Sequence, residues 1–281
     1  MKPFRPLEQN VPVGRINIGD GALTLIAGPC SIESESLCLS VAEHLAKLCN
    51  DLSMPYIFKS SFDKANRTSL NSFRGHGLDQ GLAVLAKVKE QIGVPVLTDI
   101  HETDQIGPVS DVVDVLQIPA FLCRQTDLLV ECGKSGKAVN IKKGQFLAPE
   151  DIGYAAQKVA SSGNGGVIVT ERGALFGYRD LIVDMRSLVT MRSLGYPVVF
   201  DATHSVQQMG GAGGASGGLT QFIPAQVRGA VAVGIDGLFI ETHPDPEHAL
   251  SDGSTMVPLE NMKALLEMAL ATHATHGSLT S

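Results

Sequence analysis

The sequence contains no tryptophan, and aromatic residues make up only 5% of its 281 residues. Proteins that bind nucleic-acid bases by stacking need aromatic side chains, so this composition argues against such a surface. The chain also has no excess of positive charge, because its net charge is −7 and its pI is near 5.6. An anion site would therefore be a local group of cations on an acidic protein, where a focused potential still attracts a charged substrate.

Long apolar runs are missing as well. None reaches the roughly 18 residues of a spanning helix, because Asp236 interrupts the best candidate at residues 230–240. The first residues, MKPFRPLEQNVPV, lack the apolar region of a signal peptide. Five cysteines without a secretion signal predict free thiols in a reducing compartment. We therefore expect a cytoplasmic protein without a membrane or nucleic-acid partner.

The sequence does contain a regular alternation of two patterns. Eight short apolar runs, flanked by Gly, Pro or polar residues, have the composition of buried strands. They lie at residues 23–27, 56–59, 95–100, 112–118, 138–141, 166–170, 198–201 and 238–241. Several intervals between them carry a helical period of apolar residues. This alternation predicts parallel strands with crossover helices, and a (β/α)8 TIM barrel is a normal outcome for about 250 residues.

We predict a single barrel domain over residues 1–281, although periodicity alone leaves a doubly wound open sheet as an alternative. Apolar residues around Gly14 predict a short N-terminal hairpin, within residues 4–22, that caps the barrel floor. The stretch GGAGGASGG, at residues 210–218, predicts a mobile loop over the barrel mouth. It lacks the strand and glycine spacing of a dinucleotide-binding fingerprint.

Positive charges follow several of the predicted strands. In a barrel, the active site lies at the carboxyl ends of the strands. The stretch FKSSFDKANRT passes from an apolar run into Lys59 and Lys64, and Lys142 and Arg172 follow two later runs. These four cations would repel one another in an empty site, so they predict a multiply charged anion such as a phosphate ester with a carboxylate. The alternative, that each reaches solvent or pairs with a carboxylate, is reasonable for one cation but weak for the set.

A second group combines a thiol, an imidazole and two carboxylates: Cys30, His204, Glu241 and Asp252. They follow the first, seventh and eighth strands, which are neighbours in a closed barrel. This mixture of ligands suits one divalent transition metal such as Zn, Fe, Mn or Co. From these residues alone, Cys30 is equally well explained as a small buried residue, which is the commonest fate of a free cysteine.

Eight long motifs identify a family. They are AGPCSIES at 27–34, FKSSFDKANRTS at 58–69, PVLTDIHE at 95–102, LQIPAFLCRQTDLL at 116–129, NIKKGQFLAP at 140–149, ERGALFGYRDLIVDMRSL at 171–188, VVFDATHSVQ at 198–207 and GIDGLFIETHPDPEHALSDG at 234–253. With them the chain resembles the 3-deoxy-D-manno-octulosonate 8-phosphate synthases, or 2-dehydro-3-deoxyphosphooctonate aldolases. The resemblance implies a (β/α)8 barrel, usually a homotetramer. It also implies a transferase that condenses phosphoenolpyruvate with arabinose 5-phosphate and releases phosphate, for the core sugar of lipopolysaccharide.

The resemblance also implies a role for individual residues. Those expected to bind phosphoenolpyruvate are Lys59, Lys64, Gln117, Lys142 and Arg172, and Ser61 is expected to bind substrate as well. Those expected to bind the pentose phosphate are Asn66, Arg67, Thr68 and Asp99, with Arg124 reaching the sugar phosphate of a neighbouring subunit. Those expected to take part in the chemistry are Cys30, Lys64, His204 and Asp252.

The family has two classes, and the difference bears on Cys30. Metal-independent members carry Asn at this position, whereas metal-dependent members carry Cys together with residues equivalent to His204, Glu241 and Asp252. The complete set in this chain implies the metal-dependent class. Thr220, where many members have Arg, is a departure that puts in doubt any contact expected from the glycine-rich loop.

Two rival functions are considered. A sister enzyme condenses phosphoenolpyruvate with erythrose 4-phosphate to give 3-deoxy-D-arabino-heptulosonate 7-phosphate, and it shares the Cys-His-Glu-Asp set. The stretch KANRTS, with Asn66 beside Arg67, favours the pentose substrate. A non-catalytic barrel that binds phosphosugars would be expected to have lost a metal or lysine position, and none is lost.

Overall fold

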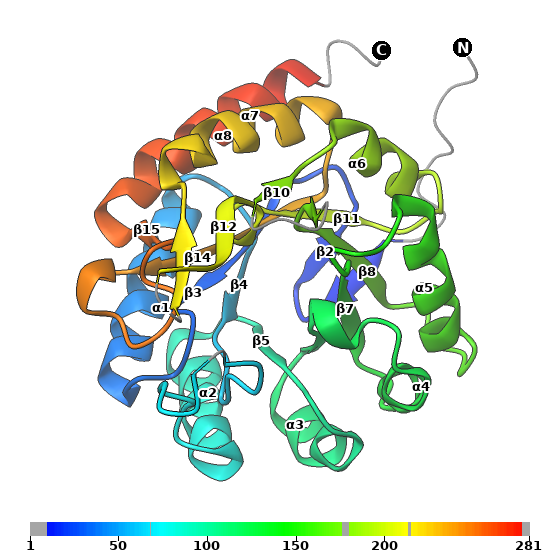
Figure 1. Cartoon of the computed structure of the whole chain (residues 1–281), viewed down its shortest axis with the longest axis horizontal. Coiled ribbons are helices and arrows are strands. Elements are labelled where there is room, and N and C mark those ends of the chain that lie inside the picture. The colour runs from blue at the N-terminus through cyan, green and yellow to red at the C-terminus, as the bar shows by residue number, and fades with distance from the viewer. Residues whose placement is uncertain (1–9, 68, 176–179, 213–214, 277–281) are drawn as a thin grey trace.

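The computed structural model of the chain describes residues 10–67, 69–175, 180–212 and 215–276. Its centre is a closed barrel of parallel strands surrounded by helices, as predicted (Figure 1). The barrel strands, in chain order, are β3 (Thr24–Gly28), β4 (Tyr56–Lys59), β5 (Val96–Asp99), β6 (Val115–Ile118), β7 (Ala138–Lys142), β8 (Val167–Glu171), β11 (Val198–Asp201) and β14 (Gly237–His243). Each pairs with the next, and β14 pairs with both β11 and β3, which closes the barrel.

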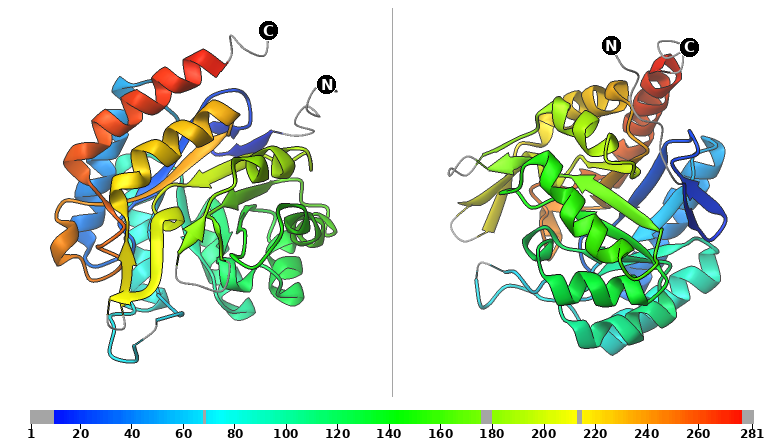
Figure 2. Two further views of the ribbon diagram at one scale, coloured as in Figure 1. Left: turned by 45° about the horizontal axis from the view of Figure 1, so that its top comes forward. Right: turned by 90° about the vertical axis from the view of Figure 1, so that its right-hand side faces the viewer.

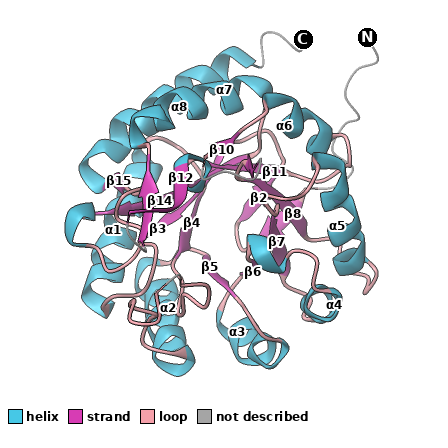
Figure 3. Ribbon diagram, in the orientation of Figure 1, coloured by secondary structure: helices cyan, strands magenta, loops and turns pink. Residues whose placement is uncertain are grey.

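The helices form the outer layer around these strands (Figure 3). They are α1 (Glu35–Asp51), α2 (Leu78–Ile92), α3 (Ile106–Val112), α4 (Thr126–Lys134), α5 (Ile152–Ala160), α6 (Met185–Arg192), α7 (Ile223–Val233) and α8 (Met262–His276). In α1, Ser34 caps the first turn by accepting a hydrogen bond from the Leu37 N–H at 3.1 Å. No helix within the described ranges is long and apolar enough to cross a membrane.

Alternate residues of each strand enter different cores, because side chains of a strand point to opposite faces. In β3, Leu25 and Ala27 pack against the helices, whereas Ile26 joins a smaller core inside the barrel. Side chains from the N-terminal hairpin complete this inner core: Val11, Val13 and Ile18. The barrel is therefore filled from the amino end, which leaves its carboxyl end for a site.

The predicted hairpin is present as β1 (Val11–Val13) and β2 (Ile16–Ile18), joined through Gly14 at a φ of 58°. Its packing with the inner core agrees with a cap on the barrel floor, while residues 4–9 lie outside the described residues. Figure 2 shows the hairpin on the side of the barrel opposite to β12 (Gln207–Ala212) and β13 (Ala215–Gly218).

Two predictions about elements are wrong in detail. The stretch expected as a strand from residue 112 begins as the last turn of α3, and β6 starts only at Val115. The glycine-rich stretch expected as a loop is largely an antiparallel hairpin, in which Gln207 pairs with Gly218 and Ala212 pairs with Ala215. Backbone hydrogen bonds do not require side chains, so a run of glycines pairs as a ribbon without any apolar pattern.

Candidate active site

A cavity of about 980 Å³ opens at the carboxyl ends of the barrel strands. Most residues predicted to bind substrate or metal line this cavity. They are Lys59, Ser61, Lys64, Asn66, Arg67, Asp99, Gln117, Lys142, Arg172, His204, Glu241 and Asp252. Residues separated by up to about two hundred positions thus meet in one place, because parallel strands bring their carboxyl ends to the same rim.

Two predicted residues do not line the cavity, and a third is not described. Cys30 lies behind the cavity wall with no exposed surface. Arg124 is exposed and does not line the cavity, although the preceding segment Ala120–Leu122 does. Thr68 lies outside the described residues.

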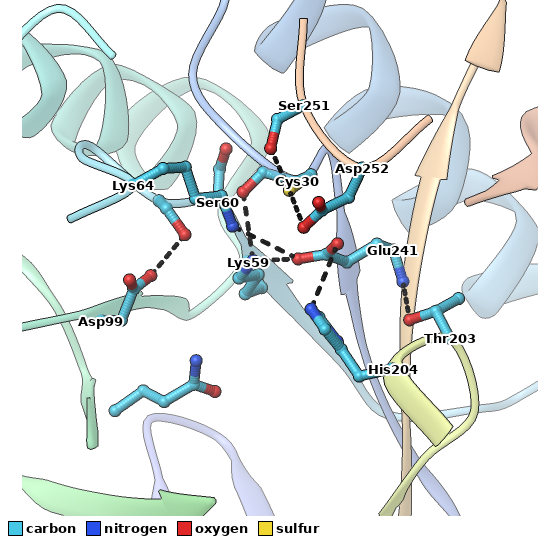
Figure 4. A network of polar contacts seen from close by, with 12 residues as sticks. Cys30, Lys59, Ser60, Lys64, Asp99, Thr203, His204, Glu241, Ser251 and Asp252 are labelled. Carbon is cyan, nitrogen blue, oxygen red and sulfur yellow. Dashed lines mark hydrogen bonds and ion pairs between the residues drawn. The ribbon is translucent and has the colours of Figure 1, made fainter. Parts of the chain in front are cut away.

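Cys30, Glu241 and Asp252 form a compact group of ligand atoms, all within 4.8 Å of one another (Figure 4). The Cys30 Sγ atom is 3.3 Å from Asp252 Oδ2 and 2.9 Å from the Ser251 hydroxyl. His204, the fourth predicted ligand, lies outside this compact group. Its contact with the group is to Glu241, with 3.7 Å between Nε2 and Oε2. That Oε2 atom is buried without a hydrogen-bond partner, as expected of an oxygen that takes a cation.

The charges around this group also fit a cation. Burial raises the pKa of the Cys30 thiol well above its usual value, and the carboxylates of Asp252 and Glu241 raise it further. Burial alone would likewise raise the pKa of Glu241, but the charges of Lys59, Lys64 and His204 hold it below its usual range. A buried thiol between two carboxylates gains most from a divalent ion, which turns a thiol into a thiolate ligand.

Lysine side chains bring positive charge to the same group. The Lys59 ammonium contacts Glu241 Oε1 at 2.5 Å and donates to the Cys30 carbonyl at 3.2 Å. The Lys64 ammonium is 3.7 Å from the same carboxylate oxygen. Burial lowers the pKa of Lys64, but the acidic groups around it, Cys30 and Glu241 first, raise the pKa well above its usual value. Lys64 therefore carries a positive charge into the cavity.

The opposite wall carries Lys142 and Arg172, from the ends of β7 and β8. The Lys142 ammonium contacts the Asp201 carboxylate and lies 3.1 Å from the centre of the Phe239 ring, a cation–π contact. Arg172 donates to the His204 carbonyl at 3.2 Å and to Gln207 Oε1 at 2.9 Å. Its second terminal nitrogen, Nη1, has no hydrogen-bond partner. A buried donor without a partner at the wall of a cavity is suited to an anionic ligand.

A third part of the wall is polar and hydroxyl-rich. The Ser61 hydroxyl donates to Asp99 Oδ1, and the other oxygen of Asp99 is 3.0 Å from His101 Nε2. Burial opposes ionisation of Asp99, but the hydrogen bond and charge of His101, with Lys64 and Lys59, hold its pKa well below the usual range. Asp99 is therefore an ionised acceptor, suited to the hydroxyl groups of a sugar.

A comparison with known sequences places this site in a family. Residues 6–275 match the profile of the DAHP synthetase I family. The chain belongs to this family. The match covers the hairpin, every strand of the barrel and all the residues described above.

Members with a curated name are similar to the chain over almost its whole length. A protein of Trichlorobacter lovleyi is 58% identical over 95% of this chain and 99% of its own length. Proteins of Geotalea uraniireducens and a Cyanothece species are 57% and 58% identical, over 95% and 91% of this chain and 98% and 94% of their own lengths. All three are named 2-dehydro-3-deoxyphosphooctonate aldolase. The resemblance predicted from the motifs is confirmed.

Several residues of this family member touch the site although they had no predicted role, among them His101, Asp201, Phe239 and Ser251. Two of them, His101 and Asp201, follow the strand-end rule that selected Asp99 and His204, so the sequence carried a signal for them. Phe239 has the pattern of a core residue. Ser251 lies in a loop whose path no periodicity predicts.

Proposed function

We propose that the chain condenses phosphoenolpyruvate with D-arabinose 5-phosphate and water to give 3-deoxy-D-manno-octulosonate 8-phosphate and phosphate. The observation that carries the proposal is one cavity in which Lys59, Lys64, Lys142 and Arg172 surround a group of metal-ligand side chains. The names of the relatives support the same reaction. The expected pathway is the synthesis of the lipopolysaccharide core sugar.

The main task of the protein in this reaction is to orient the two substrates. Carbon three of phosphoenolpyruvate forms a bond to the aldehyde carbon of the pentose, and the aldehyde oxygen takes a proton from water. The hydroxyl of that water adds to carbon two, and phosphate leaves carbon two with the remaining proton as the ketone forms. Carbon three is a weak nucleophile, so holding it against the aldehyde in a site with little water supplies much of the rate.

The two walls of the cavity divide this task. Lys142 and Arg172, with Lys59 and Lys64 opposite, bind the phosphate and carboxylate of phosphoenolpyruvate and stabilise charge on the departing phosphate. Asp99, Asn66 and Arg67, which line the same cavity, bind the pentose phosphate. These sets line adjacent parts of one cavity, so the two substrates lie side by side.

We also propose that Cys30, His204, Glu241 and Asp252 hold one divalent ion. The unpartnered Glu241 Oε2 and the buried Cys30 thiol between carboxylates support this assignment. When bound, the ion would supply Lewis acidity to the aldehyde or to water. A thiolate ligand favours softer ions such as Zn or Fe over Mg. His204 lies beside the ligand group and is the residue best placed to move a proton there.

An assay with a panel of aldose phosphates tests the reaction. We expect phosphate release from phosphoenolpyruvate only when an aldose phosphate is present, with arabinose 5-phosphate far preferred. The second candidate is the erythrose 4-phosphate enzyme, because the matching family is described by the name DAHP synthetase. Faster turnover with erythrose 4-phosphate than with arabinose 5-phosphate would establish that candidate instead. A protein that binds both substrates without turnover would be a non-catalytic barrel.

Removal of metal tests the second proposal, that these four side chains hold a divalent ion. We expect exhaustive chelation to abolish turnover while circular dichroism shows an intact barrel, and zinc or iron to restore activity. Cys30→Ala should lose both metal and turnover, whereas Cys49→Ala, which removes another buried thiol in α1, should keep both. Full activity of protein shown by elemental analysis to be free of metal would disprove the assignment.

We also propose two properties of the whole protein. Arg124 is exposed beside a segment that lines the cavity, which is consistent with a contact to the site of a neighbouring subunit in a homotetramer. All five cysteines are buried free thiols, which fits a reducing compartment such as the cytoplasm.

A further inference from the structure

The Asp201 carboxylate lies at the end of β11, between the two groups of residues to which we assign the anion and the metal. Its side chain is completely buried. It lines the floor of the cavity, although neither set of predicted binding residues includes it.

Each oxygen of Asp201 lies close to two polar groups. Oδ2 contacts the Lys142 ammonium and lies 2.8 Å from His204 Nδ1. Oδ1 accepts from the His204 backbone N–H at 2.9 Å and from the Thr203 hydroxyl at 3.2 Å. The carboxylate therefore accepts hydrogen bonds from Lys142, Thr203 and the His204 backbone, and its Oδ2 atom also lies beside the His204 ring.

On the histidine side, the contact with Asp201 leaves Nε2 as the ring nitrogen that faces Glu241. His204 Nδ1 lies 2.8 Å from Asp201 Oδ2, and the other ring nitrogen, Nε2, lies 3.7 Å from Glu241 Oε2. Figure 4 shows the second of these contacts. A histidine that ligates a metal through one nitrogen is commonly held by a carboxylate on the other, which fixes the ring and its tautomer. The Thr203 hydroxyl joins the same unit, since it also accepts from the Glu241 N–H at 3.2 Å.

On the lysine side, the contact fixes a long and flexible side chain. Lys142 extends from β7, which is separated from β11 by β8. Its ammonium is held between the Asp201 carboxylate and the face of Phe239. An ammonium held in advance loses less rotational freedom when an anion binds.

We propose that Asp201 is a positioning residue that serves both sites at once, holding Lys142 for the phosphoenolpyruvate anion and His204 for the divalent ion. The inference rests on the proposed function, since it takes from there the two ligands. One buried carboxylate then supports two binding sites, and a single change should weaken both.

The test compares two isosteric substitutions of buried aspartates. Asp201→Asn keeps the shape but removes the charge and leaves only one acceptor oxygen for donors on two sides. Asp236→Asn is the matched control, because Asp236 is also buried, pairs with Arg192 at 2.5 Å and accepts from the Val198 N–H near the amino end of β11.

Zinc affinity is measured by competition with a chromophoric chelator. Phosphoenolpyruvate affinity is measured by calorimetry on metal-free protein, so that the two effects stay separate.

We expect Asp201→Asn to weaken zinc and phosphoenolpyruvate about tenfold or more each, the range found for partners of metal-ligating residues. Asp236→Asn should change neither by more than about threefold. A folded Asp201→Asn protein that keeps either affinity would overturn the shared role. Wild-type protein that binds neither ligand would instead overturn the proposed function, and the inference with it.

Should Asp201→Asn not fold, the wild type carries a second test. In nitrogen-15 spectra of the metal-free protein, the inference requires a proton on His204 Nδ1. A ring protonated only on Nε2 would contradict it, whatever the activity of the enzyme.

Discussion

Burial acts differently on the charged side chains around the cavity, depending on their neighbours. Glu241 and Asp99 stay ionised because cations outweigh the cost of burial. For Lys142, the effect of burial on the pKa outweighs that of the neighbouring charges. Burial lowers its pKa to about 8 although Asp201 acts in the opposite direction. Lys142, which we assign to the anion site, therefore loses its charge within the pH range of ordinary assays.

This value predicts how phosphoenolpyruvate binding depends on pH. Above about pH 8 Lys142 loses its proton, so the dissociation constant should rise, by up to tenfold per pH unit. The ligand is fully ionised there, since phosphate groups titrate near pH 6, and does not contribute. Calorimetry from pH 7 to pH 10 measures the effect.

The matched variant is Lys142→Arg, because a guanidinium stays charged over the whole range. Its affinity should not change with pH. An equal rise in both proteins would assign the titration to another group. The stability of the fold changes in the opposite direction to the affinity. Between about pH 8 and pH 10.4 this lysine is protonated in the unfolded chain but not in the folded one. Its contribution to the free energy of unfolding therefore increases as pH rises.

At the scale of elements, the strands were predictable and their exact ends were not. Strands of a parallel barrel are buried on both faces and appear as short apolar runs, and every residue of β4 and β8 is buried. Val112 continues such a run although it ends a helix, because an apolar residue fits the inner face of either element. The glycines of β12 and β13 gave no signal, since a strand without side chains has no alternation to read.

Gly28, the last residue of β3, lies at a tight contact between strands that meet at the metal-ligand group. A Cβ atom there would lie 2.1 Å from the Lys59 carbonyl of β4, and Gly28 is also paired with Glu241 of β14. Gly28→Ala must therefore move the strand ends that carry Cys30, Lys59 and Glu241.

We expect Gly28→Ala to destabilise the protein by about 1–3 kcal/mol, as overpacking does, and to weaken zinc binding at least tenfold. Thermal unfolding and chelator competition measure the two effects. Gly107→Ala in α3 is the control, because nothing lies within 4 Å of the added methyl group. Unchanged zinc affinity in Gly28→Ala would mean that the strand ends tolerate the shift.

At the scale of the whole molecule, Arg124 predicts a shared site. If it reaches the sugar phosphate of a neighbouring subunit, Arg124→Ala should raise the KM for arabinose 5-phosphate with less effect on phosphoenolpyruvate. A charge-assisted contact of this kind contributes roughly 1.5–3 kcal/mol, or about ten- to a hundredfold in KM.

Mixed oligomers provide the decisive comparison. Subunits with Arg124→Ala, combined with subunits inactivated by Lys64→Ala, should regain activity, because some sites then receive intact residues from both chains. Verified mixed oligomers without any recovery would place Arg124 outside the site.

Which residues come together in the candidate site could be predicted better than the distances between them. Strand order alone brings the residues after β3, β11 and β14 together, so the neighbourhood of Cys30, His204 and Glu241 followed from the sequence. Distances did not follow, because they depend on loops. Asp252 reaches Cys30 through a loop in which its own φ is 47°, a left-handed conformation that no pattern of apolar residues indicates.

The closure of the barrel by β14 also has a consequence for the order of folding. Cys30 precedes Asp252 by 222 positions, and the pairing of β14 with β3 brings the two together. A ribosome must therefore synthesise almost the whole barrel before the thiol meets its carboxylates. The ion that we propose for this site cannot template the early stages of folding, as zinc does in small zinc domains. Its capture would instead mark the moment at which the ring of strands is complete.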